Sequence, residues 1–222
     1  MARRRLDLLP AMSKRKTPFV IGEWYHCYSR GIDKQVVFLE QGDYDRFLKA
    51  VYLTNQVEKV NLSDLTKINQ STLWKRERSS PIVTVGAYCL MPNHFHFLFK
   101  ETIPNGISMF MQRLGTAYTM YFNKKYDRSG GLFTRPFRSK HVSDDRYFRW
   151  LVNYIHMNPK ELLERCEEKE INLTREALPR ERLRDYPYSS LPDYLDVLRP
   201  EQKILDRGAV ECLLHREALP RF

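Results

Sequence analysis

The clearest pattern of apolar and polar positions in the chain lies between residues 82 and 100. Residues 82–90 form a β-branched and apolar run, Pro92-Asn93 is a turn signal, and apolar residues resume at Phe95. This pattern predicts two strands that are joined by a tight turn.

The geometry of a strand then fixes which side chains of the second segment share a face. His94 and His96 lie on one face, and Phe95, Phe97 and Phe99 lie on the other. Neutral imidazole is the commonest metal-binding side chain, and neighbours two positions apart on a strand can reach one ion. A half-exposed strand that carries two histidines by chance fits the same pattern, so the pair needs partners elsewhere in the chain.

Two further segments are predicted to be strands. Residues 24–30 mix aromatic and small polar residues, and residues 136–142 suit a short edge strand in which a proline is tolerated. On the first of these strands His26 shares a face with Tyr28 and Arg30. His26 is either a third histidine near the pair or a packed strand residue, and we favour packing.

Three stretches have apolar residues at helical spacing. Residues 43–59 and 107–122 are predicted to be amphipathic helices, of which the first covers one face of the sheet. Tyr118 and Tyr121 lie on the apolar stripe of the second helix, which favours a role in the core over one in catalysis.

The third helix, residues 144–158, follows a cluster of capping residues and carries two adjoining stripes. At about 100° per residue, the buried stripe consists of Phe148, Leu151, Val152 and Ile155, and the adjoining stripe consists of Tyr147, Trp150, Tyr154 and Asn158. Tyr154 and Asn158 are neighbours one turn apart. They are either a nucleophile with a metal-ligating oxygen beside it or two packing residues.

A chain of 222 residues with 42% hydrophobic content is long enough for one well-buried core with appendages. We predict a flexible basic arm over residues 1–18, a main domain over 19–160 and a helical C-terminal appendage over 161–222. No apolar stretch approaches the roughly twenty residues of a membrane span, so we expect a cytoplasmic protein with no membrane partner. The four scattered cysteines fit reduced, mostly buried thiols.

The net charge of +10 indicates an anionic partner, and nucleic acid is the first candidate. The densest positive run in the folded part is residues 123–140, where aromatic residues and glycines separate the cations in a way that suits phosphates and stacked bases. A solvated loop is the alternative interpretation. The basic residues that we predict to contact DNA are Lys124, Lys125, Arg128, Arg135, Arg138 and Lys140.

Together these segments resemble the single-tyrosine HUH transposases (IS200-like), and most closely their REP-associated tyrosine transposase (RAYT) branch. The likeness rests on AYCLMPNHFHFLF at residues 87–99, on the helix and basic loop at 107–133, and on YIHMNP at 154–159. It extends from about residue 24 to residue 159, with a weaker echo in YPYSS at 186–190.

The resemblance implies an α+β fold, a ferredoxin-like antiparallel sheet with helices on one face. It implies that His94 and His96 are metal ligands, that Tyr154 is the nucleophile, and that Asn158 completes the metal site. The activity would be cleavage and rejoining of single-stranded DNA hairpins through a 5′-phosphotyrosine, by a monomer or homodimer that requires Mg²⁺ or Mn²⁺. Ligand softness alone favours zinc or manganese at a site with two histidines, so the expectation of Mg²⁺ rests on the resemblance.

Two other functions remain open. A non-catalytic protein that binds single-stranded nucleic acid could use the same kind of sheet, since such sheets display aromatic residues to bases. The chain has no RNP1-type run, however, and His94 and His96 stand where stacking residues would be. A zinc hydrolase is the third possibility, weakened by the lack of an evident carboxylate general base near the pair.

Overall fold

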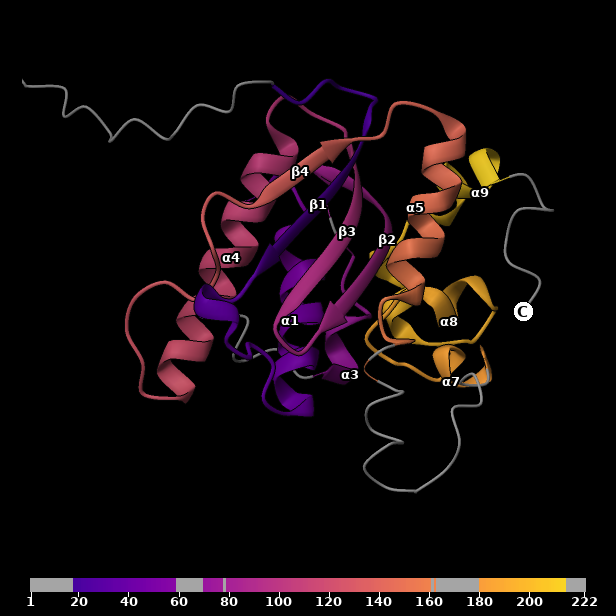
Figure 1. The fold of residues 1–222 in the computed structure, drawn as a ribbon. Coiled ribbons are helices and arrows are strands. Elements are labelled where there is room, and N and C mark those ends of the chain that lie inside the picture. Colours follow the sequence, from indigo (N-terminus) through magenta and orange to yellow (C-terminus); the bar gives the residue numbers. More distant parts are fainter. Residues whose placement is uncertain (1–17, 59–69, 78, 161, 163–179, 215–222) are drawn as a thin grey trace, which may run out of the picture.

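The computed structural model describes residues 18–58, 70–77, 79–160, 162 and 180–214. Its strands are β1 (Trp24–Arg30), β2 (Val83–Met91), β3 (His94–Glu101) and β4 (Arg138–His141), which form an antiparallel sheet in the order β2-β3-β1-β4 (Figure 1). Helix α1 (Gln41–Thr54) joins β1 to β2, and helix α4 (Gly106–Lys125) joins β3 to β4. This β-α-β-β-α-β order is the ferredoxin-like arrangement, and it confirms the predicted fold class.

One face of the sheet, which we call the phenylalanine face, is covered by α1 and α4. It carries Phe95, Phe97 and Phe99, which are 3% exposed or less. Tyr118 of α4 is fully buried in the same core, and its hydroxyl donates to the carbonyl of Val37 at 2.6 Å. The predicted packing role of Tyr118 is therefore confirmed.

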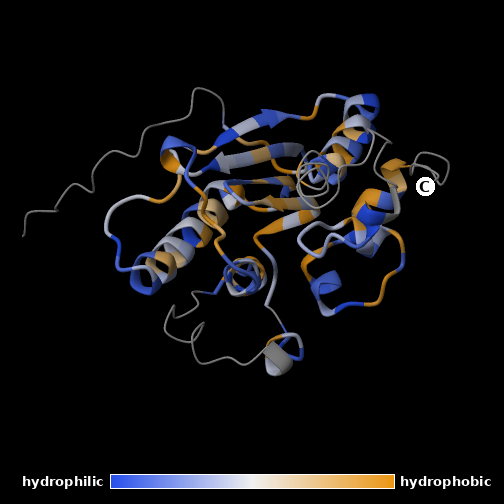
Figure 2. Cartoon of the chain, turned by 60° about the horizontal axis from the view of Figure 1, so that its bottom comes forward, coloured by the Kyte–Doolittle hydropathy of each residue, from blue (hydrophilic) through white to orange (hydrophobic). Residues whose placement is uncertain are grey.

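The opposite face, which we call the histidine face, is partly covered by helix α5 (Asp145–Met157), so helices flank the sheet on both sides (Figure 2). The expectation of helices on one face alone is wrong in this respect. A helix also covers the histidine face because the apolar stripe of α5 needs a surface to pack on. Phe148 and Ile155 of this stripe are buried in a second core with Trp24 and Leu98.

Side-chain hydrogen bonds set the ends of two helices. α1 ends at Thr54, earlier than the predicted residue 59, because the Asn55 amide binds the start of β2. Its Oδ1 accepts from the backbone N–H groups of Ile82 and Val83 at 3.1 and 3.0 Å, and its Nδ2 donates to the Val83 carbonyl at 2.9 Å. α5 begins after Asp144, whose Oδ1 accepts from the N–H of Tyr147 at 2.8 Å, as the predicted cap requires.

Strand β2 has an irregular register between Val85 and Ala87, at Gly86. A Cβ atom at this glycine would stand 2.8 Å from Cζ3 of the Trp24 ring, so only glycine lets the indole pack this closely on the strand.

Residues 180–214 pack along the outer edge of β2. The helices of this segment are α7 (Arg180–Arg184), α8 (Leu191–Tyr194), η2 (Pro200–Ile204) and α9 (Arg207–Leu214). Two short helices, η1 (Ile32–Lys34) and α3 (Gln70–Leu73), lie earlier in the chain. The N–H of Leu90 donates to the Tyr188 carbonyl at 2.8 Å, and the N–H of Ser190 donates to the Tyr88 carbonyl at 2.9 Å. This part of the predicted appendage is thus built into the core of the protein.

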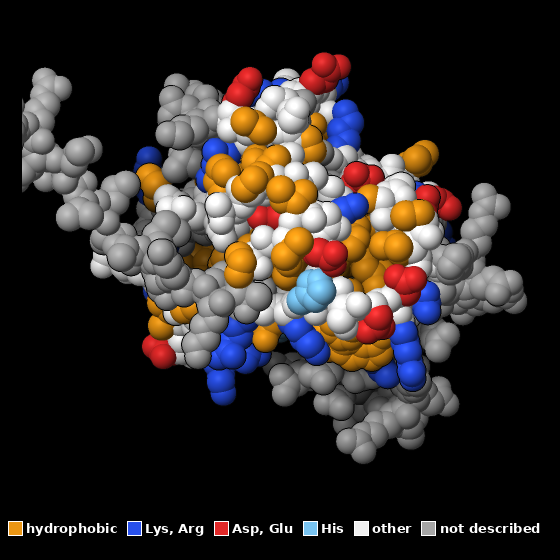
Figure 3. Space-filling model, turned by 90° about the horizontal axis from the view of Figure 1, so that it is seen from above, with side chains coloured by type: hydrophobic (Ala, Val, Ile, Leu, Met, Phe, Trp, Pro, Cys, Tyr) orange, Lys and Arg blue, Asp and Glu red, His pale blue; other side chains and the backbone are white. Residues whose placement is uncertain are grey.

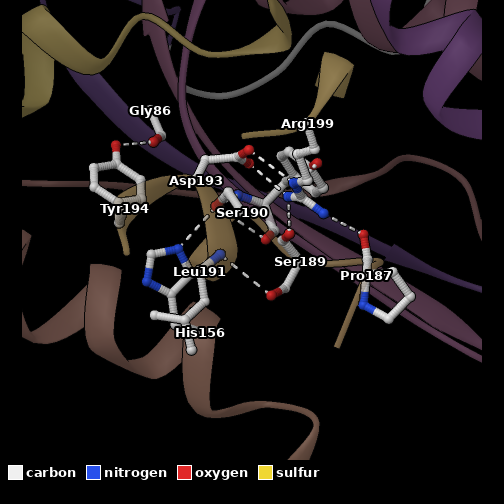
Figure 4. Close-up of polar contacts among 10 residues, drawn as sticks. Gly86, His156, Pro187, Ser189, Ser190, Leu191, Asp193, Tyr194 and Arg199 are labelled. Atoms are coloured by element: carbon white, nitrogen blue, oxygen red, sulfur yellow. Dashed lines mark hydrogen bonds and ion pairs between the residues drawn. The ribbon is translucent and has the colours of Figure 1, made fainter. Parts of the chain in front are cut away.

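A buried polar network ties the same segment to α5 (Figure 4). Arg199 forms an ion pair with the fully buried Asp193 at 2.5 Å and also donates to the carbonyls of Pro187 and Ser189. His156 of α5 shares a 2.8 Å hydrogen bond with Ser190. Because Asp193 pairs with Arg199 and the Ser190 hydroxyl is fully buried, these residues fix α5 in place and do not form a hydrolytic triad.

The predicted basic arm falls almost wholly outside the described residues, as do residues 163–179 of the predicted appendage. The domain boundaries therefore stay predictions. None of the described helices is long and apolar enough to cross a membrane.

Candidate active site

His94 and His96 stand on the histidine face at the start of β3, directly after the two-residue turn. Their ring centroids are 5.1 Å apart. Phe95 and Phe97 anchor the same stretch of strand on the opposite face. His96 is buried and His94 is half-buried, so the pair sits at the margin of the protein interior.

Each imidazole has a hydrogen-bond partner at Nδ1. The Nδ1 atom of His96 lies 2.8 Å from Nε2 of His26, and the Nδ1 atom of His94 lies 2.7 Å from Oδ1 of Asn93. Metal-ligating histidines usually have the second ring nitrogen held in this way, because the partner fixes the tautomer and the ring orientation.

The environment keeps both imidazoles neutral. Burial, followed by the charge of Arg30, lowers the pKa of His94 to about 4, while a hydrogen bond with Asn158 acts in the opposite direction. Burial, followed by the charges of His26, His94 and Arg30, lowers the pKa of His96 to about 2. Neutral imidazole is the form that binds metal ions.

Tyr154 of α5 faces the histidines. Its ring centroid is 5.7 Å from that of His96 and 6.1 Å from that of His26, both in edge-to-face orientation. Tyr154 is 40% exposed, so this residue is accessible beside the buried His26 and His96. Packing of the α5 stripe on the sheet and the hydrogen bond between His156 and Ser190 hold the helix there.

Asn158 connects the tyrosine to the histidine pair. Its Nδ2 donates to the Tyr154 carbonyl at 2.8 Å, and its side chain also bonds to His94. The predicted residues His94, His96, Tyr154 and Asn158 are therefore brought together by two elements that are distant in sequence.

The donor set of this cluster fits a divalent ion. Two neutral imidazoles and one amide oxygen are ligands that manganese and zinc accept, and an amide oxygen also suits magnesium. Within the described part of the chain, no group of three His, Cys, Asp or Glu side chains is arranged to hold a metal. A metal site here would therefore depend on Asn158 for its third protein ligand.

The six predicted DNA-binding cations do not form one group. Arg138 and Lys140 lie on the histidine face, because their strand partners are Tyr28 and His26. Lys124 and Arg135 are exposed, and Arg128 is half-buried against the Phe122 ring.

Lys125 is engaged within the protein. Its Nζ atom contacts Glu40 at 2.5 Å and the fully buried Asp43 at 2.6 Å. Removing Lys125 from these partners would leave a buried carboxylate without its cation, which is costly. The structure therefore argues against a DNA-contact role for this one residue of the predicted set.

Charges of both signs are present at one end of the molecule (Figure 3). The end shown in Figure 3 carries basic, acidic and hydrophobic side chains interspersed with one another. Among the described residues, Arg30 of β1 acts through its charge on His94 and His96. Lys140 of β4 acts through its charge on His26.

Sequence reasoning undervalued two residues of this site. The sequence leaves His26 as either a packed residue or a third histidine near the pair and favours packing; in the structure it is buried and also bonds directly to His96. Arg30 ends β1 on the histidine face, opposite His94 in the register. The period-two alternation of residues 24–30 already placed both on that face, but the pairing of β1 with β3 was needed to bring them to the histidines.

The fold and the site define a ferredoxin-like α+β protein with a histidine pair and a tyrosine on the facing helix. The sequence matches the model of the IS200-like transposase family over residues 48–158, which is half of its 222 residues. The chain belongs to the IS200-like transposase family. The matched stretch includes His94, His96, Tyr154 and Asn158, whereas β1 with His26 precedes it.

Comparison of structures finds a REP-associated tyrosine transposase bound to a REP hairpin, with a TM-score of 0.49 and 11% sequence identity. The similarity covers 86% of this chain and 90% of the other. No curated protein matches the sequence.

Proposed function

We propose that this protein is a metal-dependent transposase of the REP-associated type, which cleaves and rejoins single-stranded DNA at hairpins through Tyr154. The observation that carries the proposal is the placement of an accessible tyrosine edge-on to His96, at 5.7 Å between ring centroids. The family match includes the same residues. The preference for hairpins follows from the resemblance of residues 87–159 to the RAYT branch.

In the proposed reaction, the hydroxyl oxygen of Tyr154 attacks the scissile phosphorus. A bond from the tyrosine oxygen to phosphorus forms, the bond from phosphorus to the 3′ oxygen breaks, and the proton lost by the phenol is balanced by one gained by the leaving 3′ oxygen. The products are a 5′-phosphotyrosine and a free 3′-OH. One phosphodiester replaces another, so a second 3′-OH can reverse the step and rejoin the strand.

His94, His96 and Asn158 would hold the divalent ion, and His26 would keep the His96 ring in its ligating orientation. When bound, Mg²⁺ or Mn²⁺ supplies charge stabilisation and alignment to the scissile phosphate. Arg30, whose charge reaches both imidazoles, adds positive potential on the same side.

The test is a covalent-adduct assay with a labelled DNA hairpin and Mn²⁺. Tyr154→Phe should remove the adduct completely, because no other oxygen at this position can attack. Tyr28→Phe is the matched control, since the Tyr28 ring lies 5.5 Å from His96 on the same face and should be dispensable.

Loss of the adduct in Tyr28→Phe with retention in Tyr154→Phe would overturn the assignment. A wild-type protein that binds the hairpin and forms no adduct would favour the non-catalytic binding protein instead.

A further inference from the structure

Three aromatic side chains form a continuous row along the accessible side of α5. Tyr147 and Trp150 have ring centroids 5.7 Å apart with planes at 16°, and Trp150 and Tyr154 have centroids 5.1 Å apart with planes at 13°. Nearly parallel rings at this separation are offset from one another. We call these three residues the aromatic row.

The row is exposed at its centre. Trp150 is 55% exposed, whereas the other two tryptophans of the chain, Trp24 and Trp74, are 7% and 8% exposed. Core packing of α5 is carried by a different stripe, which includes Phe148 and Ile155. Packing among the residues that the structure describes therefore does not account for an open indole between two tyrosines.

Positive charge lies beside the row at both ends. At one end, the Nζ atom of Lys140 stands 4.4 Å from the centre of the Tyr147 ring. Further along the same face of β4, Arg138 is in register with Tyr28 and, through it, with His96. At the other end, Tyr154 meets His26 and His96, and the charge of Arg30 reaches the histidines. Aromatic faces next to cations are the combination that binds single-stranded nucleic acid, with bases on the rings and phosphates on the cations.

We propose that the aromatic row is a stacking surface for the unpaired DNA next to the scissile phosphate, with Trp150 as its principal base contact. This inference rests on the proposed function, because it places the strand on the row that ends at Tyr154. Unpaired DNA is the fitting occupant because a stacked ring needs a base whose face is free, which a duplex does not offer. The strand would run from Lys140 and Arg138 towards Arg30 and the histidines.

Trp150 also provides a direct optical test, since it is the tryptophan that solvent and DNA can reach. The experiment uses the full chain carrying Tyr154→Phe, in the absence of divalent ions. It is titrated with an unlabelled oligothymidylate and, separately, with an unlabelled abasic oligomer of the same length. Tryptophan emission should be quenched by the oligothymidylate, much less by the abasic oligomer, and not in a variant that also carries Trp150→Phe.

Affinity is measured in parallel by anisotropy of a labelled oligothymidylate. Trp150→Ala should weaken binding about 5- to 150-fold, the range found for loss of one stacked base. Trp150→Phe should recover part of the loss. Met120→Ala is the matched control, because Met120 is 58% exposed on α4, away from the row, and its removal should leave affinity unchanged.

Binding of the oligothymidylate without quenching, together with unchanged affinity in Trp150→Ala, would overturn the stacking surface. The covalent adduct of the otherwise wild-type protein would still form in that case, so the proposed function would stand. Loss of self-association in Trp150→Ala with unchanged DNA affinity would instead assign the row to contact with a second copy of the chain, and would also overturn the proposal.

Discussion

The two faces of the sheet are made by alternate residues of the same strands and differ in almost every other respect. On the phenylalanine face Phe95, Phe97 and Phe99 are sealed beneath two helices. On the histidine face β1, β3 and β4 present imidazoles and cations, and α5 covers β2 and β3 with its apolar stripe. Face and register, rather than position along the sequence, therefore separate residues that stabilise the fold from residues that we assign to chemistry.

The comparison also explains why buried polar groups are tolerated on one face. His26 and His96 are 7% and 6% exposed, yet each satisfies a ring nitrogen of the other. This hydrogen bond offsets part of the free-energy cost of burying the two imidazoles. The role that we propose for the pair is the reason for having imidazoles at these positions. On the phenylalanine face the buried Tyr118 hydroxyl donates to a backbone carbonyl, and the buried Asp43 carboxylate pairs with Lys125.

The largest contrast should come from neighbouring residues that point to opposite faces. His96→Ala should abolish DNA cleavage while the protein stays folded, since it removes a proposed metal ligand. Phe97→Ala should lower the free energy of unfolding by about 3–5 kcal/mol, because it opens a cavity in the core, and the protein that remains folded should still cleave. Urea denaturation and the adduct assay measure the two effects.

The comparison fails if the pattern is reversed. A His96→Ala variant that cleaves at the wild-type rate, or a Phe97→Ala variant with full stability and no cleavage, would show that the faces are not divided in this way. His94→Ala should behave as His96→Ala does.

A smaller effect is expected at His26, which acts through His96. His26→Leu should weaken Mn²⁺ binding about 10- to 100-fold, as loss of a group that orients a metal ligand usually does. His26→Gln should recover much of this affinity, because the amide oxygen can accept from Nδ1–H of His96. Titration calorimetry decides the question. Equal Mn²⁺ affinity in His26→Leu and wild type would reduce His26 to a packing residue.

The smallest effects concern the cations. Arg138→Ala combined with Lys140→Ala should reduce the slope of log K against log salt for single-stranded DNA by about 1.4, or about 0.7 for each phosphate contact. Lys124→Ala combined with Arg135→Ala removes the same charge from exposed positions outside the histidine face and should change the slope less. A salt series with a labelled hairpin measures both, and a larger change from the second pair would move the DNA path to the loop.

Much of this division could be predicted from the sequence. Period-two alternation placed His94 and His96 together, and helical spacing placed Tyr154 and Asn158 one turn apart. Local patterns show which residues share a face of one element, and the structure has His94 and His96 on one face of β3 as predicted. Contacts between elements are set by strand pairing and helix docking, which a single sequence leaves open.

Three features show this limit. The hydrogen bond between His26 and His96 joins residues 70 positions apart, and the ion pair between Lys125 and Asp43 joins residues 82 positions apart. The docking of α5 on the histidine face depends on Ser190 and its neighbours, which come from a segment that the sequence pattern left without a role. None of these pairings has a local signature.

The central claim, that the histidine face is a catalytic centre with Tyr154 as its nucleophile, is tested most directly by mass spectrometry of the trapped covalent complex. The protein is incubated with a DNA hairpin and Mn²⁺, digested, and searched for a peptide that carries a nucleotide. The account predicts a nucleotide joined through its 5′-phosphate to the peptide that contains Tyr154. A nucleotide on Tyr28 or on any other residue, or one joined through its 3′ end, would contradict it.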